Sequence, residues 1–164
     1  MCHVETIRSN DKPNRQMSEL PVATVSRLIK PQDLNHHGTL FAGRMAEWAV
    51  ETAFIGAQKV LAVDPREVVC IRMHGLTFSR PVRNGTVIDI RAQTAHVGKS
   101  SLTIYIETLT SDNGVTPLLD GYITFVHVNQ EGRACPHGLA VEKPASGVSL
   151  ALWEHVEGLK AQGH

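Results

Sequence analysis

The sequence predicts an α+β fold in which an antiparallel sheet curls around one long central helix. Three observations support this prediction: one long helical pattern, several alternating apolar and polar segments after it, and short turns between those segments. One helix cannot cover both faces of such a sheet. The outer face or an edge of the sheet is therefore expected to be available for a second subunit.

The chain begins with a polar segment and one strand. Residues 1–19 show no periodic apolar face and are predicted to form a flexible arm. Alternating side chains over residues 22–29 predict the first strand, and Pro31 ends it because proline has no N–H to donate. A polar loop over residues 32–40 then leads into the helix.

The central helix is predicted over about residues 42–62. Small and apolar side chains recur there at every fourth position and form one face, made of Met45, Ala49, Ala53 and Ala57. Such a row of small residues is typical of a helix that a sheet wraps closely. Asp64 and Pro65 end the helical pattern.

The remaining strands are separated by turns rich in Gly, Asn, Asp and Ser. We expect them over residues 68–73 continuing into 76–78, then over 86–97, 102–110 and 118–128. Helical spacing also predicts a short C-terminal helix over about residues 148–160. The chain thus divides into the arm (1–19), a core domain (20–138) and a tail with a short helix (139–164).

Charge and composition argue against several classes of partner. Lys+Arg and Asp+Glu both number 16, so the zero net charge does not point to nucleic acid or to an anionic membrane. No segment is apolar enough to span a bilayer, and the N-terminus lacks the apolar part of a secretory signal. The 3 cysteines and 9 histidines are scattered and form no metal-binding pattern. We therefore expect a cytoplasmic protein without a metal site.

The segment LNHHGTLFAG, residues 34–43, places polar groups directly before the apolar helix. The first N–H groups of a helix have no partner inside it, and the helix dipole favours negative charge at this end. The combination predicts a functional site at the start of the helix.

Three blocks of sequence give the chain a family resemblance. Residues 35–43 are similar to the pattern N-x-x-G-x-x-F/H-G-G, and residues 76–85 are similar to D-F-x-x-P-V-x-x-G-D. The third block is Val97-Gly98-Lys99-Ser100-Ser101 with the strand after it, followed by Tyr122–Val126. In this order they resemble the hotdog-fold acyl-CoA thioesterases, in particular the bacterial acyl-CoA hydrolases related to the mammalian cytosolic acyl-CoA hydrolase.

The resemblance implies an assembly and a reaction. It implies that residues 20–138 form a hotdog domain and that the minimal unit is a homodimer, stacked as a trimer of dimers. The active sites would lie between subunits, where acyl-CoA is hydrolysed to free acid and coenzyme A. No cofactor is implied beyond the coenzyme A of the substrate.

Three residues are the candidates for catalysis. Asn35 matches the family's loop Asn, and the Gly43 amide is expected to donate to the oxyanion of the thioester carbonyl. The family often reads M-D-E on the helix, whereas this chain has Val50 in the place of the Asp. Glu51 is the nearest remaining acid, and we expect it to act as general base or nucleophile. Ala42 also replaces the first Gly of the usual pair.

Each candidate also has a purely structural interpretation. Asn is common in turns and helix caps, and Gly43 could be small only because the helix packs closely there. Glu51 lies on a polar stripe with Arg44, Glu47 and Gln58, which could simply face solvent or another subunit. Glu47 is a weaker candidate for the acid.

Binding of the coenzyme A moiety would use the loops. The phosphates need cations and donors, which are offered by Arg80, Arg83, Gly98, Lys99, Ser100 and Ser101. His36 and His37 are expected to line the entrance, with direct chemistry as a lesser alternative.

Other side chains and other functions are less strongly indicated. Cys70 is expected to be a buried, inert thiol, and Trp48, Phe54 and Phe78 are expected to pack in the core or to border an acyl tunnel. The main alternative function is a non-catalytic acyl-CoA-binding hotdog, a sensor or scaffold, which the loss of the Asp at Val50 favours. A hydratase is disfavoured because the chain lacks the motif of that class.

Overall fold

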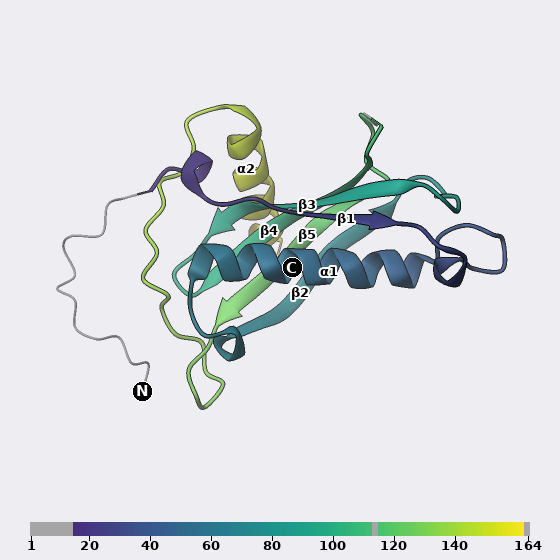
Figure 1. Cartoon of the computed structure of the whole chain (residues 1–164). Coiled ribbons are helices and arrows are strands. Elements are labelled where there is room, and N and C mark those ends of the chain that lie inside the picture. The colour runs from purple at the N-terminus through teal and green to yellow at the C-terminus, as the bar shows by residue number, and fades with distance from the viewer. Residues whose placement is uncertain (1–14, 113–114, 163–164) are drawn as a thin grey trace.

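The computed structural model describes residues 15–112 and 115–162. It contains a five-stranded sheet in the order β1-β3-β4-β5-β2, and every neighbouring pair of strands is antiparallel. Helix α1 (Ala42–Leu61) crosses one face of this sheet, and helix α2 (Gly147–Ala161) lies on the other face (Figure 1). This arrangement confirms the predicted α+β class.

Every predicted strand and helix is present within one residue of its expected bounds. The strands are β1 (Ala23–Leu28), β2 (Val68–Phe78), β3 (Val87–Val97), β4 (Ser101–Thr110) and β5 (Leu119–His127). Three short 3₁₀ helices were not predicted: η1 (Met17–Glu19), η2 (Pro31–Asp33) and η3 (Pro65–Glu67).

The predicted flexible arm, residues 1–19, lies mostly outside the described residues. Its described end is tied to the tail, because Arg15 pairs with Val141 in an isolated bridge. Met17 is buried against the core. The last residues of the arm therefore pack on the domain.

Helix α1 packs closely on the sheet because its inner face is made of small residues. Ala49, Ala53 and Ala57 are fully buried. A Cβ built on Gly56 would lie 3.1 Å from the Cβ of Ala92 in β3, so a side chain larger than Ala has no room there. The row of small residues thus lets the sheet wrap the helix, as the sequence predicts.

Helix α2 covers part of the outer face of the sheet, the face turned away from α1. Leu152 and Val156 of this helix form a small buried cluster with Ala95, against which Tyr105 and Tyr122 pack. This face or an edge of the sheet was expected to be available for a second subunit. Helix α2 occupies part of the face, and exposed large apolar side chains lie along the edge strand β2.

The expectation that Cys70 is buried is wrong. Cys70 is exposed in β2, although it pairs with Phe125 on the inner side of the sheet. The reason is that β2 is an edge strand and α1 lies mainly over β3 and β4, so little covers β2. Desolvation still raises the pKa of the Cys70 thiol above its ordinary value, which disfavours the reactive thiolate. Exposed apolar side chains share this strand: Val69, Ile71, Met73 and Phe78.

A buried histidine joins α2 to the sheet and makes the stability depend on pH. The ring of His96 lies 4.3 Å from that of Trp153, and Lys160 donates to its Nδ1 at 3.1 Å. Burial, with the nearby charges of Lys160 and Lys143, lowers the pKa of His96 from 6.5 to about 4, while Glu157 opposes the shift. The folded state therefore binds fewer protons than the unfolded state between these two pH values.

We expect the His96 contribution to the free energy of unfolding to be complete above pH 6.5 and lost as the pH falls towards 4. The loss is expected to be roughly 3 kcal/mol, because the ring must be charged inside a buried contact. The measurement is urea unfolding of the wild type and His96→Gln from pH 7 to 4, with exposed His155→Gln as the control. A difference between wild type and His96→Gln that does not change over this range would contradict the expectation.

Candidate active site

The loop before α1 is held in shape by the side chain of Asn35. Its Oδ1 accepts hydrogen bonds from the backbone N–H of His37 at 2.9 Å and of Thr39 at 3.3 Å, and its Nδ2 donates to the Thr39 hydroxyl at 3.2 Å. Asn35 thus has the turn role that the sequence left open. An Asn amide has two N–H hydrogens, so one remains to donate to a carbonyl or to a water molecule.

The first turn of α1 presents unpaired backbone amides. Phe41 precedes the helix with extended backbone angles and makes no side-chain cap. Its carbonyl accepts from the N–H of Arg44 and Met45, whereas the amides of Ala42 and Gly43 donate to no other described residue. Ala42 and Gly43 are both exposed. This helix start is therefore a place where a developing oxyanion could be bound.

The ring of Phe41 explains why residue 43 is glycine. A Cβ built on Gly43 would lie 2.5 Å from Cε1 of Phe41, so a side chain there would displace the ring. The three atoms nearest to this Cβ position all belong to the exposed Phe41 ring and none to the sheet. Phe41 was not among the predicted site residues, since only the fold shows that its ring lies over the next turn.

A pocket of about 230 Å³ opens beside this helix start. It is lined by Leu40, Ala42, Met45, the last residue of β2, Phe78, and residues 79–82 after it. The loop and the lining are joined by backbone bonds, because the N–H of Leu40 donates to the Val82 carbonyl. The pocket is therefore a fixed feature of this end of the domain.

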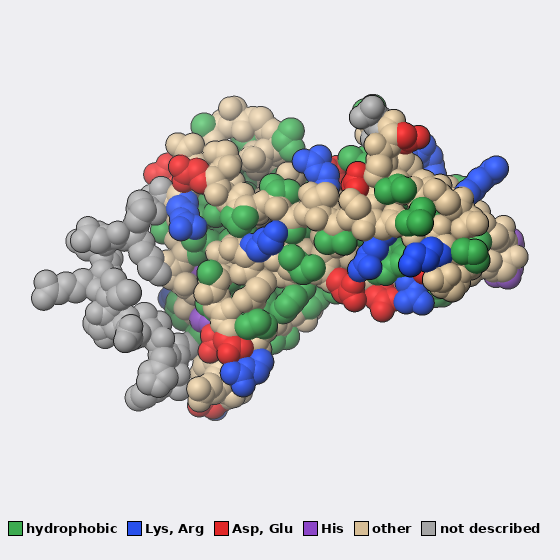
Figure 2. Space-filling model, in the orientation of Figure 1, with side chains coloured by type: hydrophobic (Ala, Val, Ile, Leu, Met, Phe, Trp, Pro, Cys, Tyr) green, Lys and Arg blue, Asp and Glu red, His purple; other side chains and the backbone are tan. Residues whose placement is uncertain are grey.

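The predicted entrance residues lie at the same end. His36 and His37 are exposed, with ring centroids 3.9 Å apart. Thr39 pairs with Arg83 in an isolated bridge, and Arg80 donates to the Thr116 carbonyl at 2.9 Å. Figure 2 shows Lys and Arg side chains gathered around this end of the molecule, with histidine at its tip.

The turn of residues 98–101 lies at the opposite end of the sheet. It connects the end of β3 to the start of β4, and its Ser100 carbonyl accepts from the N–H of His127 at the end of β5. Strand β3 spans the distance between the two ends, which is roughly 30 Å for its 11 residues. One chain therefore does not bring Gly98, Lys99, Ser100 and Ser101 near Asn35 and Gly43.

Glu51 lies on the exposed side of α1, where it faces β1. Its carboxylate is 3.5 Å from the guanidinium of Arg27 in β1, and both side chains are about half exposed. The guanidinium also lies 5.4 Å from the centre of the Trp48 ring. Arg27 was not among the predicted site residues, because an ion pair between a strand and a helix this far apart in sequence has no local signal.

Val50 and Glu47, which are near Glu51 in α1, lie in different surroundings from it. Val50 is half-buried and packs against the apolar core, about 100° round the helix from Glu51. Glu47 is exposed and paired with Arg44 at 2.9 Å. Of the expected aromatic residues, Phe54 packs on Phe125 in the core with ring centroids 6.1 Å apart, whereas Phe78 is exposed beside the pocket.

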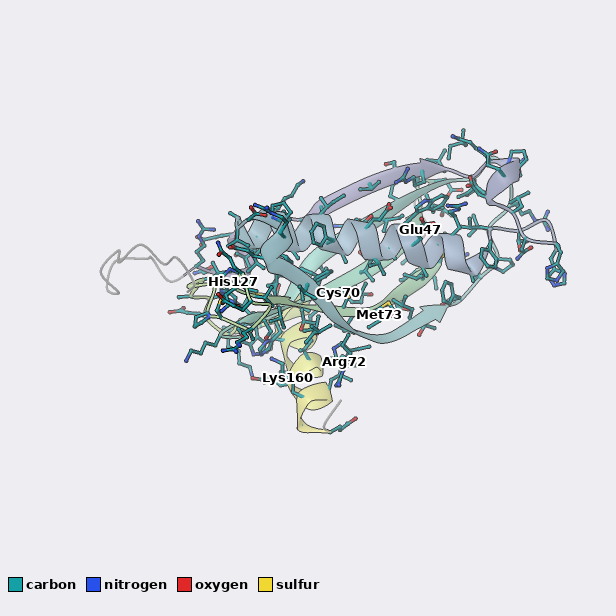
Figure 3. All side chains as sticks on the ribbon, turned by 90° about the horizontal axis from the view of Figure 1, so that it is seen from below. Glu47, Cys70, Arg72, Met73, His127 and Lys160 are labelled. Carbon is teal, nitrogen blue, oxygen red and sulfur yellow. The ribbon has the colours of Figure 1, made fainter. Side chains whose placement is uncertain are left out.

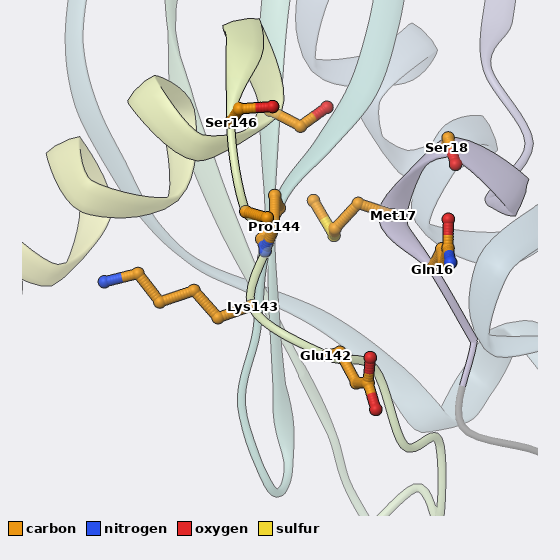
Figure 4. A pocket seen from close by; sticks show the side chains of 9 residues that line it. Gln16, Met17, Ser18, Glu142, Lys143, Pro144 and Ser146 are labelled. Carbon is orange, nitrogen blue, oxygen red and sulfur yellow. The ribbon is translucent and has the colours of Figure 1, made fainter.

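Two other kinds of site were considered in the described part of the chain: a metal site and a second hollow. Residues 15–112 and 115–162 contain no group of three His, Cys, Asp or Glu side chains that could hold a metal ion. A further hollow of about 310 Å³ lies between η1 and residues 142–149 (Figure 4). Both polar and apolar atoms line this hollow, and none of the predicted site residues lines it.

Comparison with known proteins decides the family. The sequence model of the thioesterase superfamily matches residues 37–116. The Escherichia coli K12 protein named acyl-CoA thioester hydrolase YciA is 32% identical over 123 residues, which are 70% of this chain and 88% of that protein. The chain belongs to the thioesterase superfamily.

Other relatives of this thioesterase-superfamily member agree with the hotdog fold. An uncharacterized acyl-CoA thioester hydrolase, YkhA of Bacillus subtilis, is 26% identical over 74% of this chain and 70% of that protein. The acyl-CoA hydrolase of Staphylococcus aureus, solved with butyryl coenzyme A, coenzyme A and coenzyme A disulfide, superposes with a TM-score of 0.76. It is 27% identical, and the match covers 92% of this chain and 90% of that one.

A hexameric neighbour also matches this superfamily member. The thioesterase y2039 of Yersinia pestis, described as hexameric, superposes with a TM-score of 0.62 and 27% identity over 70% of this chain and 93% of that one. The predicted hotdog fold, a sheet wrapped round a central helix, is thus confirmed. Among the described residues, no helix has the length and apolar character needed to cross a membrane.

Proposed function

We propose that this protein hydrolyses acyl-CoA thioesters to a carboxylic acid and coenzyme A. The observation that carries the proposal is the 32% identity, over 70% of the chain, to a protein named acyl-CoA thioester hydrolase. The unpaired amides at the start of α1, beside the pocket and Asn35, supply what the chemistry of a thioester needs.

The proposed reaction begins with the thioester carbonyl at the start of α1. The Gly43 amide donates to the carbonyl oxygen, and the remaining Nδ2 hydrogen of Asn35 orients the carbonyl or the attacking water. Glu51 of the facing chain acts as the base that takes a proton from water, or as the nucleophile itself, because Glu51 of the same chain lies about 12 Å further along α1 than Gly43. Attack on the carbonyl carbon gives a tetrahedral intermediate, from which the C–S bond breaks, and the thiolate leaves and is protonated. Where Glu51 is the nucleophile, water then hydrolyses the resulting acyl-glutamyl anhydride, which releases the acid and regenerates the Glu51 carboxylate.

A complete site in this proposal needs two chains. The start of α1 and the turn of residues 98–101 are roughly 30 Å apart in one chain, so a second chain must bring its own turn to the first chain's helix start. The exposed apolar β2 edge is the proposed seam of this homodimer. The hexameric relatives favour a trimer of dimers as the full assembly.

The coenzyme A moiety is proposed to bind along that junction. Arg80 and Arg83 at one chain's helix end, and Lys99 on the other chain's turn, would bind phosphate oxygens. The amides and hydroxyls of the turn, from Gly98, Ser100 and Ser101, would complete the phosphate contacts, with His36 and His37 at the entrance. No cofactor beyond the substrate's own coenzyme A is proposed, and a cytoplasmic location stays a prediction.

The test of the function is release of free thiol from a panel of acyl-CoAs, including short, long, aromatic and hydroxylated acyl groups. We expect saturable release with at least one of them, and the panel also identifies the preferred acyl group. The second candidate, a non-catalytic acyl-CoA-binding module, is supported by Val50 in place of the family's acid. It is the conclusion if acyl-CoA binds but no substrate releases thiol.

Gly43→Ala is expected to lower kcat by about 10- to 100-fold while the protein stays folded. The added methyl group displaces the Phe41 ring and crowds the amide that binds the oxyanion. The matched control is Gly158→Ala in α2, where nothing lies within 4 Å of the new Cβ. Turnover of Gly43→Ala equal to that of the control would remove the Gly43 amide from the mechanism.

A further inference from the structure

A second pocket lies on the outer face of the sheet, away from the helix start that carries the proposed chemistry. It has a volume of about 490 Å³ and is formed by β2, β4, β5 and α2. This volume falls within the range of small-molecule sites in proteins. Figure 3 shows Arg72 and Lys160, two of its lining residues, together beside α2 on the far side of the sheet from α1.

The pocket combines apolar walls with two cations that form no ion pair with residues 15–112 or 115–162. Ile71, Val156 and Leu159 supply the apolar lining. Arg72 and Lys160 line it too, and within the described residues neither forms an ion pair with a carboxylate. Burial lowers the pKa of Lys160, whereas the nearby charge of Glu157 opposes this shift only in part. An anion in the pocket would supply the missing charge.

An irregularity in β2 shapes the pocket. The pairing register with β5 shifts between Cys70 and Arg72, so Ile71 has no partner in the ladder. Arg72 pairs with Thr124, which places both on the outer face, and the shift leaves Ile71 on the pocket as well. A regular strand would have turned Ile71 and Arg72 to opposite faces. Bulges that redirect side chains in this way are common beside binding sites.

Hydroxyl groups form the polar floor between the cations and the apolar wall. The Thr124 hydroxyl lies 2.9 Å from Nε2 of His74 and 2.9 Å from the Thr103 hydroxyl, and Ser101 also lines the pocket. These groups can donate to oxygen atoms. Together with two cations they suit a small, planar, singly charged oxyanion, and the apolar wall suits a hydrocarbon chain attached to it.

We propose that this outer-face pocket binds a carboxylate that carries a short or medium hydrocarbon chain. The carboxylate lies between Arg72 and Lys160, and the chain lies along Ile71, Val156 and Leu159. The ligand has the same chemical class as the acid released by the proposed reaction, and this connection alone rests on the proposed function.

The test is isothermal titration of the full chain with sodium octanoate, which needs no turnover. We expect saturable binding with one site per chain, and an affinity at least about tenfold weaker in Arg72→Gln and in Lys160→Gln. Lys143→Gln, the same change at an exposed lysine paired with Glu157, is expected to bind like the wild type. Octan-1-ol, which lacks the carboxylate, is expected to bind without sensitivity to either substitution.

A further measurement separates this pocket from the helix start. Gly43→Ala is expected to bind octanoate normally, because Gly43 does not line this pocket. Absence of octanoate binding, or binding that Arg72→Gln and Lys160→Gln leave unchanged, would overturn the proposal. If the protein releases no thiol from any acyl-CoA, the octanoate titrations still test the pocket, because they measure binding and not turnover.

Discussion

Glu51→Gln is expected to abolish thiol release, with a loss of about 1,000-fold in kcat and little change in the unfolding temperature. Glutamine keeps the size and polarity of the side chain but cannot take a proton or attack a carbonyl carbon. The lost ion pair with Arg27 joins two half-exposed side chains, and such pairs contribute about 0–1 kcal/mol to stability. The measurement is steady-state thiol release from the preferred acyl-CoA, with thermal unfolding in parallel.

Glu47→Gln provides the matched control for this experiment. Glu47 lies one turn earlier on the same helix and is paired with Arg44, so the substitution removes an equivalent charge and an equivalent ion pair. Its kcat is expected to stay within about threefold of the wild type, because the pair is exposed. Near-normal turnover in Glu51→Gln would exclude Glu51 as the acid. If Glu47→Gln alone lost activity, the acid role would belong to Glu47.

Gly121→Ala is expected to destabilise the fold by about 3 kcal/mol, although it adds only one methyl group. A Cβ built on Gly121 in β5 would lie 2.7 Å from the carbonyl oxygen of Gly75 and 2.8 Å from Cδ2 of Leu76. Gly75 has φ of +58° and lies where the register of β2 shifts, so the clash is with backbone that has little freedom to move. The change must therefore displace the edge strand.

The measurement for Gly121→Ala is thermal unfolding at a fixed protein concentration. A loss of this size corresponds to roughly 6–12 °C in Tm for a chain of this length. Gly158→Ala, the same substitution in open space on α2, is expected to hold or slightly raise Tm, because Ala favours a helix over Gly. Equal Tm values for the two variants would show that β2 can move away from Gly121 without cost.

The elements of this fold could be predicted from the sequence because their signals are local. The four-residue spacing of Ala49, Ala53 and Ala57 predicts a helix with a narrow inner face, and that face is fully buried. Alternation of apolar and polar residues along β3 and β4 predicts strands, because successive side chains in a strand point to opposite faces of the sheet. The bounds of these elements were predicted well for the same reason: turns are set by the few residues within them.

The exposure of β2 could not be predicted, because it depends on the order of strands in the sheet. The apolar pattern around Cys70 is the same for an edge strand as for a central one. Only the order β1-β3-β4-β5-β2, with α1 over the middle strands, decides that Cys70 and Met73 are left uncovered. The register shift that turns Ile71 and Arg72 to one face likewise has no clear sign in the sequence.

Some features of the candidate site are encoded in local sequence, and others depend on tertiary packing. The polar loop that contains Asn35 and the helix start that contains Gly43 can be read from ten consecutive residues, so both were predictable. The ion pair of Glu51 with Arg27, and the place of the turn of residues 98–101 at the other end of the sheet, depend on the packing of distant segments. Local sequence sets dihedral angles and periodicity, whereas distances between segments far apart in the chain depend on how the whole core packs.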